Sequence, residues 1–266
     1  MEIISLGPQE LGLSALLVVL LAVISTIQQL GIGKKILIAA CRTVIQLSLI
    51  GIVLKTLFET VHLLWISLIA FTMLFIAGRE VMARQQRRFS GIWGFGIGTT
   101  SMFLSSFVIT LLSLQLIISP TPWYTPQYAI PLLGMMLGNT MNSISLGLDQ
   151  LTREVWRGKG VIEARLVMGQ SWQEAILSFR KEALRTSMIP SINSMAAAGL
   201  VSLPGMMTGQ ILAGNSPDTA VKYQILIMFM ITAGAGFGSL CAVWLGARRL
   251  FDSRHRLRLD RLHPPK

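Results

Sequence analysis

The sequence has little charge. Only 13% of its 266 residues are Asp, Glu, Lys or Arg, about half of the share that soluble globular chains carry. Hydrophobic residues make up 52% of the chain, and several apolar runs reach the roughly 20 residues that a helix needs to cross a bilayer. The shortage of charge excludes an ordinary soluble domain and predicts an all-α integral membrane protein.

Cysteine is scarce, and a secretion signal is missing. Cys41 and Cys241 both fall inside apolar runs, so the sequence indicates no disulfide framework. The residues before the first apolar run include Glu2 and Glu10 and no basic residue, unlike the start of a cleaved signal peptide. We therefore expect this run to be retained as a membrane span.

The sequence also lacks the motifs of an enzyme. No G-x-x-x-x-G-K pattern followed by Ser or Thr occurs, and GIGKK at 31–35 has neither its spacing nor its hydroxyl. The three histidines, His62, His255 and His263, fall in loops or in the tail, and no His, Cys and carboxylate cluster has metal-ligand spacing. We predict no catalytic residue and no cofactor within this chain, and a metal site stays unknown.

We expect seven transmembrane helices in a membrane domain over residues 1–247. Residues 149–189 of this domain are expected to be a cytoplasmic segment, and residues 248–266 a basic cytoplasmic tail. The expected spans are 11–31, 36–57, 63–80, 92–118, 128–148, 190–213 and 222–247.

The basic residues predict the orientation of these spans. With the N-terminus outside, every Lys and Arg except Lys55 and Lys222 falls in or beside an inner loop or in the C-terminal tail. Such an excess on one side is typical of the cytoplasmic face. The net charge of +11 therefore indicates topology and not nucleic-acid binding. We expect a multi-pass protein of a bacterial cytoplasmic (inner) membrane with a cytoplasmic C-terminus.

Four pairs of glycines predict close packing between the spans. The two members of each pair are four residues apart, a spacing that lets helix backbones approach in lipid, although chance spacing is an alternative. The pairs are Gly94 and Gly98, Gly134 and Gly138, Gly205 and Gly209, and Gly234 and Gly238.

A charged segment at 161–190 predicts two helices joined by a tight elbow. Gly169 fits the position after a helix, where a left-handed backbone suits glycine. Ser171-Trp172-Gln173-Glu174 has the pattern of a capping box. An apolar stripe follows, which suits either a helix that shields the base of the bundle or one that docks on another protein. Its members are Trp172, Ile176, Phe179 and Ala183.

The elbow resembles the EAA loop of ABC-transporter permeases. The resemblance runs through Glu163-Ala164 and Gly169 to an apolar helix that leads to Ile189-Pro190, with Arg165 where a second alanine is usual. In those permeases the loop forms a coupling helix that docks in a groove on a separate ATPase subunit. The resemblance assigns ATPase coupling to Glu163, Ala164, Gly169, Ser171, Trp172 and Glu174.

Five stretches carry a second resemblance, which covers nearly the whole chain: GLVSLPGMMTGQILAG (199–214), AVKYQILIMFMI (220–231), SRH (253–255), CRTVIQL (41–47) and IPLLGMMLGNTMN (130–142). They are similar to the FetB-type (YbbM-like) ABC permeases. That family is regarded as the membrane subunit of an iron-linked exporter that pairs with a FetA-type ATPase, and its plant relatives are linked to aluminium tolerance. The resemblance implies a homodimeric permease with two ATPase subunits, which would bind ATP and Mg.

Methionines and neutral polar residues in the fifth and sixth expected spans are candidates for a substrate path. Thioethers suit soft ions better than ferric iron, and the same residues could instead fill gaps or link helices. Pro204, between Gly199 and Gly205, predicts a kink or break between Ser202 and Met206, either for a gate or for packing. The candidates are Asn139, Asn142, Met135, Met136, Asn193, Ser194, Pro204, Met206 and Met207.

The leading hypothesis is therefore a permease that exports iron or another metal ion with ATP hydrolysed by a separate subunit. A different substrate or direction is an alternative, because an EAA-like loop is compatible with import and export. Two others are a non-transporting membrane protein that transmits ATPase motion, which the short outer loops disfavour, and a carrier or channel that needs no ATP.

Overall fold

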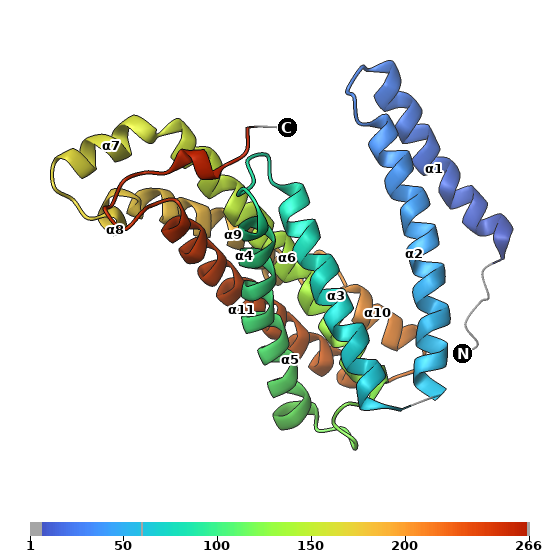
Figure 1. Cartoon of the computed structure of the whole chain (residues 1–266). Helices are drawn as coiled ribbons and strands as arrows, with labels where there is room; N and C mark the ends of the chain where they lie inside the picture. Colours follow the sequence, from blue (N-terminus) through green and yellow to red (C-terminus); the bar gives the residue numbers. More distant parts are fainter. Residues whose placement is uncertain (1–6, 60, 265–266) are drawn as a thin grey trace. The chain divides into compact units, whose positions relative to one another are not determined.

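The computed structural model describes residues 7–59 and 61–264, and all the elements in those ranges are helices (Figure 1). The chain divides into two units, one containing the first two helices and the other the helices from Leu63 onward, with residues 212–214 grouped with the first. Five segments of the described residues are long and apolar enough to cross a membrane: Pro8–Ile27 (α1), Gly33–Glu59 (α2), Leu63–Arg84 (α3), Ile92–Ile118 and Pro217–Arg249 (α11).

The first unit is a hairpin of α1 and α2. Pro8 occupies the first turn of α1, where its missing N–H costs nothing. At the start of α2, a Cβ placed on Gly33 would lie 2.9 Å from the Ala22 carbonyl oxygen, so glycine permits the close approach of the two helices. Few other residues of the hairpin are buried within it. Its apolar side chains therefore face outward, as membrane spans require.

The second unit contains a long helix with two π-helical stretches. It runs through Ile92–Met102 (α4), Phe103–Phe107 (η1), Val108–Leu112 (α5) and Ser113–Ile118 (η2). Its limits coincide with those of the span expected at 92–118. A π-helical turn inserts a residue into the hydrogen-bond ladder and frequently occurs at functional sites.

The centre of the second unit is Pro126–Arg157 (α6). It packs against α3, α11 and the helix Leu177–Ala197 (α9). The core includes Leu133, Ile144 and Leu148 of this helix, each almost inaccessible to solvent. Because α6 packs against these three helices, it fixes the positions of the helices that carry the candidate sites.

The expected sixth span, 190–213, differs from the structure in two ways. Pro190 lies inside α9, which begins at Leu177, so the proline does not mark the start of this helix. The helix ends at Ala197 and resumes only at Gly205–Leu212 (α10). The expected break therefore exists but begins earlier than predicted, because Gly199 adopts a φ of +80° and its N–H donates to the Ser202 carbonyl.

The segment after α11 is folded and not an extended tail. Leu259–Arg261 form a short 3-10 helix, η3. Bridges join Phe251 to Leu257 and Phe89 to Leu262, and the Ser90 N–H donates to the Arg261 carbonyl over 2.8 Å. In Figure 1 this red segment lies at the end of the bundle that also holds Lys159–Val167 (α7) and Trp172–Ala175 (α8). We call this end, α7, α8 and residues 250–264, the base.

Candidate functional site

The elbow between α7 and α8 has the backbone that its sequence predicts. Gly169 follows the last turn of α7 with a φ of +88°, a region that favours glycine. Three N–H groups close this turn, those of Met168, Gly169 and Gln170, and each donates to a carbonyl of α7 over 3.0–3.1 Å. The chain therefore reverses here without leaving the end of α7 unpaired.

The capping box at Ser171 is confirmed. The Ser171 N–H and its hydroxyl each donate to Glu174 Oε2 over 2.8 Å, and the Glu174 N–H returns a bond to Ser171 Oγ over 3.4 Å. The Ser171 side chain and backbone hydrogen bonds lower the pKa of the Glu174 carboxyl. These two residues therefore fix the direction in which α8 leaves the elbow.

Arg165 braces the elbow from inside. Its Nη1 atom donates to the Ala175 carbonyl over 3.0 Å and to Ser178 Oγ over 3.1 Å. This ties α7 to the corner between α8 and α9. The residue that departs from the EAA pattern thus has a structural role, which the alanine usual in that pattern could not perform.

Trp172 is buried against the segment after α11. The centre of its ring lies 5.6 Å from that of the Phe251 ring, and its backbone N–H donates to His255 Nδ1 over 3.1 Å. The other members of the expected apolar stripe, Ile176, Phe179 and Ala183, are also buried or half-buried. The stripe therefore faces the molecule itself and is not available to a separate protein.

The most exposed large apolar residues of the elbow lie at its tip. Val167 is 89% exposed and Met168 is 71% exposed. Glu163, Ala164 and Gly169 are exposed around them. A small apolar tip within a charged segment, mounted on a braced turn, is the kind of surface that another protein covers.

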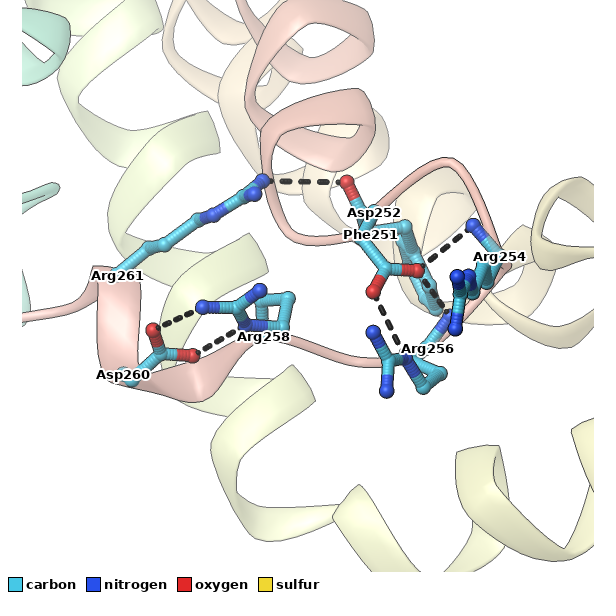
Figure 2. Close-up of polar contacts among 7 residues, drawn as sticks. All are labelled: Phe251, Asp252, Arg254, Arg256, Arg258, Asp260 and Arg261. Atoms are coloured by element: carbon cyan, nitrogen blue, oxygen red, sulfur yellow. Dashed lines mark hydrogen bonds and ion pairs between the residues drawn. The ribbon is translucent and has the colours of Figure 1, made fainter.

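Ion pairs order the segment to which Trp172 is anchored (Figure 2). Asp252 accepts the backbone N–H groups of Arg254 and Arg256 and the Arg256 Nε over 2.8–2.9 Å, and these bonds lower its pKa, chiefly the one from the Arg256 backbone. Arg258 holds both oxygens of Asp260 and lowers the pKa of that carboxyl to about 2. Each ion pair joins residues close in the sequence, Asp252 with Arg256 and Arg258 with Asp260, and so stabilises a local turn.

Arg261 connects this segment to the end of α11. Its Nη1 atom donates to the Arg249 carbonyl over 2.7 Å and to the Phe251 carbonyl over 3.2 Å. Figure 2 shows the second of these bonds reaching across from the short helix η3. Arg261 therefore fixes the backbone of Phe251, whose ring packs against that of Trp172.

The methionines proposed for the substrate path occupy different environments. Met136 is buried among Leu132, Ile227 and Met230, and its terminal methyl group faces Gly234 of α11. Met135 is half-buried against the same cluster. In this arrangement Met136 fills the space that glycine leaves on α11.

The two asparagines are exposed residues of α6. Asn139 is exposed and its Nδ2 atom donates to the Met135 carbonyl of its own helix over 2.8 Å, while Asn142 accepts a hydrogen bond from Arg84. Asn193 and Ser194 of α9 are also exposed. We call these four residues the open polar face.

The remaining candidates follow the break in the chain. Pro204 is half-buried and its carbonyl accepts the Thr208 N–H over 3.1 Å, which starts α10. Met206 and Met207 are half-buried, and the Met207 N–H donates to Gln224 Oε1 of α11 over 3.3 Å. The structure does not bring them into one cluster with the open polar face.

One set of buried hydroxyl groups was not predicted from the sequence. Within the described part of the chain, five hydroxyl oxygens are buried without a hydrogen-bond partner in the helices from α4 to α11: those of Ser101, Ser106, Thr110, Thr140 and Ser239. A buried polar group without a partner costs about 1–3 kcal/mol. We call these residues the hydroxyl seam. Helical spacing along 101–110 could have revealed three of its five members.

Glycines bring the seam's helices together. A Cβ placed on Gly238 would lie 2.6 Å from Thr140 Cγ2 and 2.8 Å from Ser105 Oγ, and one on Gly234 would lie 3.2 Å from Thr140 Oγ1. Gly94 and Gly98 likewise approach Met82 and Val81 of α3. Both pairs thus pack closely, whereas a Cβ at Gly138, Gly205 or Gly209 would meet no atom within 4 Å.

Comparison with known proteins identifies the relatives of this chain. The sequence profile of the family described as "Uncharacterised protein family (UPF0014)" matches residues 8–251. A UPF0014 membrane protein of Synechocystis is 37% identical over 86% of this chain and 88% of its own length. The probable iron export permease protein FetB of Escherichia coli is 33% identical over 96% of both chains. Protein ALUMINUM SENSITIVE 3 of Arabidopsis thaliana is 33% identical over 92% of this chain and 88% of its own.

These matches confirm the resemblance to FetB-type permeases and its plant relatives. No solved structure matches significantly.

Proposed function

This chain belongs to the UPF0014 family and is a multi-pass membrane protein, and on that premise we propose that it is the permease subunit of an ABC transporter. In this proposal it exports iron or another metal ion across a bacterial cytoplasmic membrane, using ATP that a separate FetA-like subunit hydrolyses. A full-length relative is named a probable iron export permease. The proposal has seven spans, namely the five segments long and apolar enough to cross a membrane together with α6 and α9–α10, with the N-terminus outside and the base in the cytoplasm.

The observation that carries the proposal is the apolar tip of the elbow. Val167 and Met168 are the most exposed large apolar side chains of the elbow, at 89% and 71%, whereas Val161 and Leu177 are 53% and 44% exposed. A docking surface on a soluble ATPase needs such an apolar centre with charged residues at its rim. The tip, and not Trp172, is the part of the elbow that would seat on the partner.

The contacts behind the tip would carry motion into the membrane. Arg165 ties α7 to the corner at Ala175, and α9 then continues without interruption through Pro190 to Ala197. A displacement of the elbow would therefore be passed to α9, in which Pro190 leaves one backbone hydrogen bond unmade and permits a bend. The break at 198–204 is where that movement could be converted into opening or closing.

Two copies of the chain with two ATPase subunits would form the complete transporter, as in other ABC systems. The open polar face then suits the path between the copies, because its amides and hydroxyl are exposed in a single chain. Neutral oxygen ligands of this kind would bind a metal ion weakly enough to release it. The hydroxyl seam inside one copy is the competing route.

The docking role is tested at the tip with a matched pair of substitutions. We expect Met168→Glu to abolish stimulation of ATPase activity and co-purification of the ATPase subunit, because it puts a charge into an apolar contact. Gln170→Glu adds the same charge two residues away and serves as the control. Co-purification of the Met168→Glu variant at wild-type level, or equal loss in both variants, would contradict docking through the tip.

The path is tested in proteoliposomes that contain the whole complex. We expect Asn139→Leu to lower metal-stimulated ATPase activity and export while the isosteric Thr140→Val leaves both near wild type. The reverse result would move the path to the hydroxyl seam. Equal ATPase responses to ferrous iron, manganese, zinc and aluminium would remove iron as the preferred substrate, and full transport without nucleotide would remove the ABC assignment.

A further inference from the structure

A pocket opens where the end of α11 meets the segment that follows it. Its volume is about 630 Å³. One wall consists of Trp93 of α4 and Trp244 of α11, and the opposite wall comes from the folded base, including Trp172 and His255. Neither the EAA-like elbow tip nor the open polar face contributes to it.

The pocket is positively charged. Arg248, Arg249 and Arg261 all line it, against one carboxylate, Asp252. That carboxylate already accepts three hydrogen bonds from Arg254 and Arg256, as Figure 2 shows. The guanidinium of Arg249 lies 4.4 Å from the ring centre of Trp93. The pocket therefore presents a surplus of planar cationic donors, which suit a phosphate group.

An apolar groove adjoins the pocket. Its volume is about 320 Å³, and it shares Trp93 and Leu245 with the charged pocket. From there it continues along α4 past Gly96 and Ile97 to Thr100. A Cβ placed on Gly96 would meet no atom within 4 Å, so the glycine leaves the groove open.

We propose that the pocket and the groove together bind one anionic phospholipid. The phosphate lies against Arg248 and Arg249, and an acyl chain lies along α4 in the groove. The charge of the pocket and the apolar character of the groove fit the two ends of such a molecule. A soluble phosphate would contact only the charged pocket and not the apolar groove.

The surroundings favour a membrane lipid over a soluble anion. Ile92 is 83% exposed, Trp93 52% and Trp244 46%, and all three are on helices that are apolar enough to cross a membrane. Exposed tryptophans beside arginines at the end of a span mark the level of the lipid headgroups. Arginines at this level attract anionic lipids in particular.

The lipid would also steady the elbow. The wall of the pocket opposite α4 contains Trp172 and His255, whose contacts with each other and with Phe251 hold α8 in place. An occupied pocket fills the space beside this anchor. The inference rests on the membrane location of the chain and is independent of which substrate it transports.

Native mass spectrometry of the full-length protein in detergent tests the site. The probes are dioleoyl phosphatidylglycerol, dioleoyl phosphatidylcholine and glycerol 3-phosphate. We expect one phosphatidylglycerol to bind more tightly than either other probe. Arg248→Gln with Arg249→Gln should weaken it about fivefold for each charge removed, and Arg254→Gln, which removes an arginine outside the pocket, should not.

The groove provides a second and independent variant. Gly96→Leu should block phosphatidylglycerol binding without disturbing internal packing, whereas Gly51→Leu, on a lipid-facing helix with equal space around it, should have no effect. Equal binding of phosphatidylcholine, full competition by glycerol 3-phosphate, or unchanged binding in both the arginine and the Gly96 variants would each overturn the proposal. A change only in the dimer fraction would also overturn it and indicate a subunit interface.

Discussion

The base and the membrane core of the second unit are held together in different ways. The base is tied by directional polar contacts, such as the Arg165 bond to the Ala175 carbonyl and the Arg261 bond to the Phe251 carbonyl. The core between α4, α6 and α11 is held by glycines and small hydroxyl residues, five of whose oxygens have no partner within the described chain. The two regions therefore respond to different kinds of substitution.

The difference follows from the solvent around each region. In water, apolar burial and ion pairs can both hold a short segment in position. In lipid there is little hydrophobic force between helices, so close backbone approach supplies the contact energy. Substitutions that remove polar side chains should therefore destabilise the base, and substitutions that enlarge a side chain should destabilise the core.

Trp172→Ala should have the largest effect, because it empties the contact between the elbow and the segment after α11. The loss of a buried tryptophan costs about 3–5 kcal/mol, and here it would release α8 locally. Limited proteolysis of the purified protein should show new cleavage near Gly169 and near His255. Trp172→Phe keeps a ring against Phe251 and should remain resistant. Cleavage at neither position would show that other contacts hold the base.

Gly238→Leu should come next and tests the core. The added side chain would run into Thr140 and Ser105, and overpacking of this kind costs about 1–3 kcal/mol. We expect a lower unfolding temperature and less monodisperse protein in detergent. Gly209→Leu is the matched control, because no atom lies within 4 Å of its Cβ position. Equal behaviour of the two variants would contradict close packing at Gly238.

Ser171→Ala should have a smaller effect, confined to the base. Removing a capping hydroxyl costs about 1 kcal/mol, and the Glu174 carboxylate would lose one of its two donors. Hydrogen exchange of the amides of α8 should become faster, while that of α11 should stay unchanged. Equal changes in both helices would show that the cap stabilises more than the elbow.

Asp260→Asn should have the smallest effect and should depend on pH. Arg258 depresses the pKa of this carboxyl to about 2 in the folded protein, below an unfolded value of about 3.9. The stabilisation is thus fully present above pH 4 and is lost as the pH falls toward 2. The difference in unfolding temperature between the wild type and the variant should be full at pH 6, about half as large at pH 3 and lost at about pH 2 or below. A constant difference would contradict the ion pair.

The parts of the fold that local sequence signals determine were predictable. The limits of the helix Ile92–Ile118 follow from its apolar length, and the Ser171–Glu174 capping box follows from four adjacent residues. Glycine at 169 is likewise required by its own backbone angle. Each of these features depends on interactions within a few residues, which sequence patterns contain.

Features that depend on distant contacts were not predictable. Trp172 was assigned to ATPase coupling on resemblance alone, and its burial depends on Phe251 and His255, about 80 residues away along the chain. The fold of residues 250–264 depends in turn on Phe89 and Ser90. The expected sixth span begins at Pro190, whereas a proline inside a helix is tolerated where neighbouring helices support it.

The length of α9 and the proline within it determine how a displacement could travel along this helix. At 1.5 Å per residue, a helix of 21 residues is about 30 Å long, close to the thickness of the hydrocarbon core of a bilayer. Pro190 lacks the N–H that a helical hydrogen bond needs, so the helix can bend there. A displacement applied at Leu177 would therefore reach Ala197 reduced by any bend at Pro190, and the seven residues from 198 to 204 would absorb part of the rest.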